Sequence, residues 1–130
     1  TLSVIRKSMF EVVNKNRGTA YKARIKEVPY MMGGKTGTIQ VRRISAAERE
    51  EGVIKNEDRP WEHRDHALFV GYAPVENPRY AVAVVVEHGG SGASMAAPMA
   101  HDILLRAQIK FATHQTELSS VNGHQSLGTS

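Results

Sequence analysis

The sequence lacks cysteine altogether and has one tryptophan among its 130 residues. The absence of thiols excludes a disulfide scaffold, a thiolate zinc site and a cysteine nucleophile. No stretch approaches the roughly 18 consecutive apolar residues of a membrane-crossing helix, and the first twenty residues have no signal-peptide pattern. The six histidines are scattered, so we expect no metal site, and no motif indicates a cofactor.

The composition is that of one folded domain, but its charge is uneven. Hydrophobic residues make up 41% and charged residues 23% of the chain, which excludes wholesale disorder. Residues 1–43 carry ten Lys or Arg against two acidic residues, whereas residues 44–130 carry seven against eleven. The basic segment Lys22–Arg43 leaves a nucleic-acid-binding module as an alternative. It contains no recognised module and acidic sequence follows it, so we expect no nucleic-acid partner.

Apolar residues at helical spacing predict two helices. The first covers residues 2–17. The second begins near Ser94, and a buried stripe is expected where apolar residues recur every four positions, at Met95, Met99, Ile103, Ala107 and Phe111. We expect this helix to end by Thr113 and residues 113–130 to form a mobile polar tail.

Three segments are predicted to be strands. The alternation from Ile39 to Arg42 is typical of one strand, and His66–Ala73 and Tyr80–Val86 have the length and β-branched content of two more. The short turn-forming link between the last two predicts an antiparallel pair. Their nearly continuous apolar character predicts cover on both faces of the sheet. A charged excursion over residues 45–64, with one short helical turn, separates them from the first strand.

The most informative motif is Gly34-Lys35-Thr36-Gly37-Thr38. A phosphate-binding loop would need glycine at position 29, which is proline, and a helix afterwards, where the sequence predicts a strand. The alternative is Lys-Thr-Gly at the start of an edge strand, as in penicillin-binding proteins and class A β-lactamases. An edge strand offers free backbone groups, Gly37 lets a ligand approach, and the Lys and Thr side chains suit a carboxylate.

The surrounding motifs resemble the C-terminal part of the transpeptidase domain of class B penicillin-binding proteins, most nearly the elongation type. The matching segments, in order, are Asn16–Ala20, Gly34–Val41, Arg64–His66, Phe69–Pro74, Asn77–Val84 and Glu87–Gly90. The resemblance implies an α+β fold of the β-lactamase and transpeptidase type, with helices packed on the faces of an antiparallel sheet. The family's sheet has five strands, three of which fall in residues 1–112 of this chain.

The resemblance also implies functions for the motif residues. Lys35 and Thr36 would be catalytic, and Thr36, Gly37 and Thr38 would bind the substrate. The backbone N–H of Thr38 would be an oxyanion donor. The implied activity is a D,D-transpeptidase that cross-links peptidoglycan through a serine acyl-enzyme. Its partners would be stem peptides ending in D-Ala-D-Ala and β-lactam antibiotics, at the periplasmic face of the bacterial inner membrane, with the parent protein anchored there.

One part of the family's machinery is missing. No serine in the chain is followed three residues later by lysine, so the Ser-x-x-Lys nucleophile is absent. Ser120-Val121-Asn122 matches Ser-x-Asn only by coincidence, because that motif precedes Lys-Thr-Gly in the family. We therefore interpret the chain as a piece of a transpeptidase that is inactive alone. A fragment of a serine β-lactamase or of a β-lactam sensor is the alternative.

The strand Tyr80–Val86 leads us to expect association between copies of the chain. In the family it pairs on its far side with a strand from earlier in the domain. Without that neighbour it would be an apolar strand edge, which favours association between copies. We therefore expect the chain by itself to self-associate.

Overall fold

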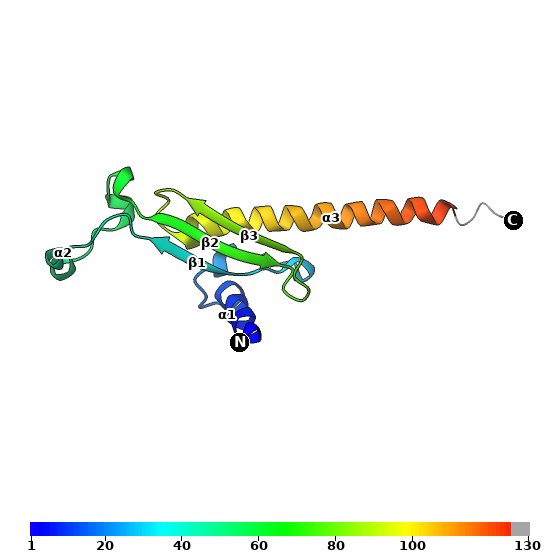
Figure 1. Ribbon diagram of the computed structural model, residues 1–130, viewed down its shortest axis with the longest axis horizontal. Helices are drawn as coiled ribbons and strands as arrows, with labels where there is room; N and C mark the ends of the chain where they lie inside the picture. Colours follow the sequence, from blue (N-terminus) through cyan, green and yellow to red (C-terminus); the bar gives the residue numbers. More distant parts are fainter. Residues whose placement is uncertain (126–130) are drawn as a thin grey trace.

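The computed structural model describes residues 1–125 and has an α+β architecture, which confirms the expected fold class. A sheet of three strands lies in front of a long C-terminal helix, and the N-terminal helix lies against the β1 side of the sheet (Figure 1). The principal elements are, in order, α1 (Leu2–Asn14), β1 (Gly33–Ile39), α2 (Ala46–Glu51), β2 (His66–Ala73), β3 (Tyr80–Val86) and α3 (Ala97–Gln125).

The sheet is antiparallel with the order β1-β2-β3. The bounds of β2 and β3 are those predicted from their apolar runs. The first strand differs, because β1 ends at Ile39, where the sequence predicted a strand to begin. The Lys-Thr-Gly motif therefore lies inside the strand, and its residues are paired with β2 along their whole length.

Helix α3 packs on the sheet through alanines and not through the predicted stripe. Its buried residues, counting the π-helical turn Gly92–Ala96 before it, are Gly92, Ala96, Ala97, Ala100, Leu104 and Gln108. Met95, Met99 and Ile103 are 40–51% exposed, so the expectation of a buried stripe there was wrong. Small side chains let the helix backbone approach the sheet closely, and the turn before the helix requires glycine at position 92. A Cβ atom there would lie 2.3 Å from the Leu68 carbonyl oxygen.

The opposite face of β2 and β3 is open in the part of the chain that the structure describes. Residues in β3 alternate between partly buried and exposed, and Val70 and Val85 on the open face are 47% and 61% exposed. The expected cover on both faces is therefore largely missing from this face. The apolar run reflects two apolar surfaces, but on the second surface α1 reaches β2 only near its end, where the Tyr72 hydroxyl donates to the Arg6 carbonyl at 3.3 Å.

Helix α3 also continues beyond its predicted end. It runs to Gln125 and projects far past the sheet, whereas we expected it to end by Thr113 (Figure 1). The hydroxyls of Thr113 and Thr116 donate to the carbonyls of Ile109 and Ala112 at 3.1 Å, so these polar residues bond within the helix. The remaining residues of the predicted tail, 126–130, lie outside the described residues.

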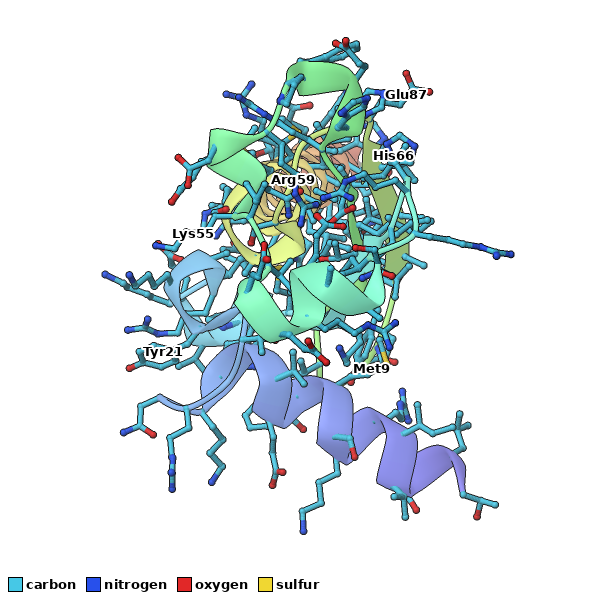
Figure 2. The ribbon with its side chains drawn as sticks, turned by 90° about the vertical axis from the view of Figure 1, so that its left-hand side faces the viewer. Met9, Tyr21, Lys55, Arg59, His66 and Glu87 are labelled. Carbon is cyan, nitrogen blue, oxygen red and sulfur yellow. The ribbon has the colours of Figure 1, made fainter. Side chains whose placement is uncertain are left out.

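The excursion between β1 and β2 folds back onto the sheet through a buried ion pair. Arg59 and Asp65 lie 3.3 Å apart with side chains 6% and 10% exposed. The other Asp65 carboxylate oxygen accepts from the backbone N–H of Val41, just after β1. Arg59 lies among other side chains in the upper middle of Figure 2, whereas Lys55 lies to its left. Asp65 thus fixes both ends of the excursion at one end of β1 and β2.

Helix α2 is stabilised by a local charge network. Ser45 accepts a hydrogen bond from the Glu48 backbone N–H, and the Glu48 carboxylate accepts from the Ser45 backbone N–H, which together form a capping box. Arg42 contacts the same carboxylate at 2.6 Å. These bonds, the one from Arg42 foremost, lower the pKa of Glu48 from 4.5 to about 2.

Replacement of Asp65 tests the anchoring of the excursion. Asp65→Ala leaves the buried Arg59 guanidinium without its carboxylate, so we expect a loss of about 3–5 kcal/mol in the free energy of unfolding measured with urea. Glu57→Gln is the control, because Glu57 pairs with Lys55 at 4.0 Å with both side chains about three-quarters exposed. It should change stability by less than about 0.5 kcal/mol. Equal effects of the two variants would contradict the anchoring function.

Acidification tests the network at α2. Because the folded-state pKa of Glu48 lies below its ordinary value, its stabilising effect is present above pH 4.5 and is lost as the pH falls toward about 2. A carboxyl titration followed by NMR should give a pKa of about 2 for Glu48. Arg42→Gln should move it toward 4.5. A Glu48 pKa that does not respond to Arg42→Gln would refute the network.

Candidate active site

The Lys-Thr-Gly residues lie on the edge strand of the sheet formed by residues 1–125. Lys35, Thr36 and Thr38 pair with Val70, Phe69 and Ala67 of β2. No strand of residues 1–125 pairs with the other side of β1, although α1 lies against that side of the sheet. Successive side chains of a strand point to opposite faces. Lys35 and Gly37 therefore belong to the open face of the sheet, and Thr36 and Thr38 to the face that α3 covers.

The Lys35 side chain turns toward the strand edge. Its ammonium nitrogen donates to the backbone carbonyl of Thr36 at 2.7 Å, and the side chain is exposed. Thr38 is also exposed, and Thr36 is partly buried. A positive charge and two hydroxyl groups are thus present within four consecutive residues of one strand. These groups are donors toward an anion such as a carboxylate.

The glycines of β1 fall into two classes. A Cβ atom at Gly34 would lie 2.2 Å from the Phe69 ring, so the packing of Phe69 requires glycine there. A Cβ atom at Gly37 would meet only the Leu68 Cβ, at 3.4 Å, which is an ordinary contact. The packing of residues 1–125 therefore does not require a glycine at position 37. The missing side chain leaves space on the face that carries Lys35.

Two hydrogen bonds that the sequence did not reveal connect β1 to α1 and the loop after it. The Asn14 side-chain amide donates to the carbonyl of Met32, just before β1, at 2.9 Å. The hydroxyl oxygens of Thr19 and Thr36 lie 3.0 Å apart. Thr19 stands 17 residues before its partner, and neither periodicity nor local spacing points to such a contact.

The histidines near the other end of β1 bond to each other and to the backbone. The His66 Nδ1 accepts from the backbone N–H of His88 at 2.9 Å, and the His88 Nδ1 lies 2.9 Å from the carbonyl of Arg64. The Trp61 and His88 rings lie 4.4 Å apart, which attaches the excursion to the loop after β3. Within residues 1–125, no group of three His, Cys, Asp or Glu side chains is placed to hold a metal ion.

A hollow of 740 Å³ lies between the loop after α1 and the first turns of α3. Thr19 is one of the residues that line it, together with Tyr21, Lys22, Ser94, His101 and Asp102 among others. The His101 Nδ1 lies 3.0 Å from the carbonyl of Ala23, which connects the two walls. The hollow therefore borders the residue that contacts the Lys-Thr-Gly motif.

Relatives of known sequence match most of the chain. It is 38% identical over 101 residues to the peptidoglycan D,D-transpeptidase MrdA of Haemophilus influenzae, covering 76% of this chain and 14% of that protein. It is 35% identical over 117 residues to the peptidoglycan D,D-transpeptidase MrdA of Acinetobacter baumannii, covering 85% and 16%. The chain therefore spans about one-seventh of the length of these relatives.

Solved structures match the fold. The complex of penicillin-binding protein PBP2 with MreC from Helicobacter pylori aligns with a TM-score of 0.64 at 30% identity, over 81% of this chain and 16% of that one. Pseudomonas aeruginosa PBP2 in complex with WCK 5153 aligns with a TM-score of 0.57 at 40% identity, over 78% and 18%. The family described as penicillin binding protein transpeptidase domain matches residues 1–105. The chain thus belongs to the penicillin-binding protein transpeptidase family and is similar to its PBP2-type members.

Proposed function

We propose that this chain supplies the substrate-binding edge of a peptidoglycan D,D-transpeptidase. The observation that carries the proposal is the open edge of β1, where the Lys35 ammonium bonds to the Thr36 carbonyl beside the Thr36 and Thr38 side chains. A stem peptide ending in D-Ala-D-Ala is extended and carries a terminal carboxylate. It can align along the free strand edge while the carboxylate accepts from the threonine hydroxyls.

Each motif residue then has a distinct function. The Thr36 and Thr38 hydroxyls hold the terminal carboxylate of the peptide, or that of a β-lactam. The Thr38 backbone N–H donates to the oxygen on which negative charge develops during acyl transfer. Lys35 stabilises that charge and assists proton transfer at the nucleophile. Gly37 leaves room for the bound acyl group, in agreement with the absence of any packing requirement for glycine there.

The nucleophilic serine lies outside this chain. No serine of the sequence has lysine three positions later, and acyl transfer of this type requires that serine. We propose that it comes from the part of the parent protein that this chain does not contain, and that the chain alone is inactive. The parent protein would be anchored in the inner membrane and act at its periplasmic face. Within residues 1–125, no helix is long and apolar enough to cross a membrane.

The test is acylation of the complete parent protein by a fluorescent penicillin. We expect one covalent label per molecule, and we expect Lys35→Ala and Thr38→Val to slow labelling by at least about tenfold, the effect of losing a hydrogen bond to a charged group. Both side chains are exposed, so the melting temperature should stay within a few degrees. A variant that melts lower but labels normally would assign that residue a structural function. Rapid release of the opened drug would indicate a β-lactamase instead.

Gly34 and Gly37 of β1 provide a matched pair of variants. Gly37→Ala should slow acylation while changing the free energy of unfolding by less than about 1 kcal/mol, because its Cβ meets only an ordinary contact. Gly34→Ala adds the same methyl group against the Phe69 ring and should cost about 1–3 kcal/mol. Thermal unfolding and acylation rates of both variants separate packing from ligand approach. Normal acylation of Gly37→Ala would contradict the placement of the ligand.

A further inference from the structure

Thr19 lies in a loop whose backbone is fixed on both sides. The Ala20 N–H donates to the Val12 carbonyl at 3.1 Å, and the Gly18 N–H donates to the Lys15 carbonyl at 2.8 Å. A Cβ atom at Gly18 would lie 2.2 Å from the Val12 carbonyl oxygen, so the loop runs directly against the end of α1. Ala20 is buried, whereas Thr19 is exposed. The loop therefore places the Thr19 side chain at a defined point without burying it.

At that point the Thr19 side chain contacts the Thr36 hydroxyl. The two side-chain oxygens lie 3.0 Å apart, and either can be the donor. Each hydroxyl has one hydrogen, so one hydrogen fills the contact and the other remains available to an acceptor. When an acceptor-only carboxylate binds to Thr36, the favourable order is Thr19 donating to Thr36 and Thr36 donating to the carboxylate. The contact also selects one of the rotamers that a threonine hydroxyl can adopt.

We propose that Thr19 is a positioning residue for the substrate carboxylate and acts through the Thr36 hydroxyl. The inference rests on the proposed function, because it assigns Thr36 to carboxylate binding. Thr19 holds the Thr36 hydroxyl with its hydrogen directed to the ligand and polarises that hydroxyl through the shared bond. The substrate feature that Thr19 helps to recognise is the negative charge of the carboxylate.

A structural function for the contact would have different consequences. The hydrogen bond joins exposed side chains, and water can replace either partner, so its loss should have little effect on folding. If the contact were purely structural, its loss would also change the acylation rate equally for charged and uncharged ligands. A positioning function should appear only with ligands that carry the carboxylate, and only while Thr36 has its hydroxyl.

The experiment measures acylation of the complete parent protein by a carboxylate-bearing penicillin and by its methyl ester. Thr19→Val retains the branched shape without the hydroxyl, and we expect about tenfold slower acylation by the acid, from the loss of one hydrogen bond in the relay. Acylation by the ester should change less than about twofold. Thr19→Ser retains the hydroxyl and should recover the rate with the acid. In a Thr36→Val background, Thr19→Val should have no further effect.

The outcomes separate this inference from the function on which it rests. An unchanged rate for Thr19→Val, an equal loss with acid and ester, failure of Thr19→Ser to recover the rate, or an additive effect with Thr36→Val would each overturn the positioning function. If Thr36→Val slows the acid but Thr19→Val does not, the proposed function stands and only the inference fails. A parent protein that neither drug acylates overturns both.

Discussion

The open edge of β1 is the constraint on which the site depends. A strand paired on one side presents the backbone donors and acceptors of its other side to whatever lies there. In residues 1–125, β1 pairs only with β2, and the Lys-Thr-Gly motif lies within the paired length. The same exposure that makes an edge prone to unwanted pairing makes it suitable for an extended peptide. The Lys35 ammonium at the Thr36 carbonyl adds a charge to that edge.

The remainder of the chain holds this edge in place from three directions. Asn14 bonds to the backbone just before the strand, and Asp65 bonds to the backbone just after it. On the face that α3 covers, Gly92 approaches β1 and β2 so closely that a Cβ atom would lie 2.6 Å from the Gly37 carbonyl oxygen. Contacts at both ends and on one face leave the outer edge of the strand without a pairing strand in residues 1–125, with α1 and Thr19 beside it.

The sequence predicts the features that depend on interactions between neighbouring residues, and it fails for those that depend on contacts between distant segments. The bounds of β2 and β3 follow from apolar runs that end at turn-forming residues, which is a local signal. The buried side of α3 does not follow from a local signal. Met99 and Ile103 are more hydrophobic than Ala100, and only the packing of the helix against the sheet selects the alanine side. The polar sequence after Thr113 also does not indicate that α3 continues. Its threonine hydroxyls donate to carbonyls of the same helix, which a count of apolar residues does not reveal.

The sequence identifies the residues of the candidate site but not the contacts that they make. Lys35, Thr36, Gly37 and Thr38 are identifiable from their order alone, and their functions remain predictions. The contact between Thr19 and Thr36 joins a loop to a strand across 17 residues and becomes visible only when both are placed. The distinction between Gly34 and Gly37 likewise depends on the Phe69 ring, which the motif does not contain.

Whether the edge of β1 binds the substrate can be tested by a crystal structure of the complete parent protein acylated by a β-lactam with a free carboxylate. We expect the carboxylate to lie about 3 Å from the Thr36 and Thr38 hydroxyls, and the acyl carbonyl oxygen to accept from the Thr38 backbone N–H. An acyl group bonded to its serine with both its carboxylate and its carbonyl away from β1 would contradict it.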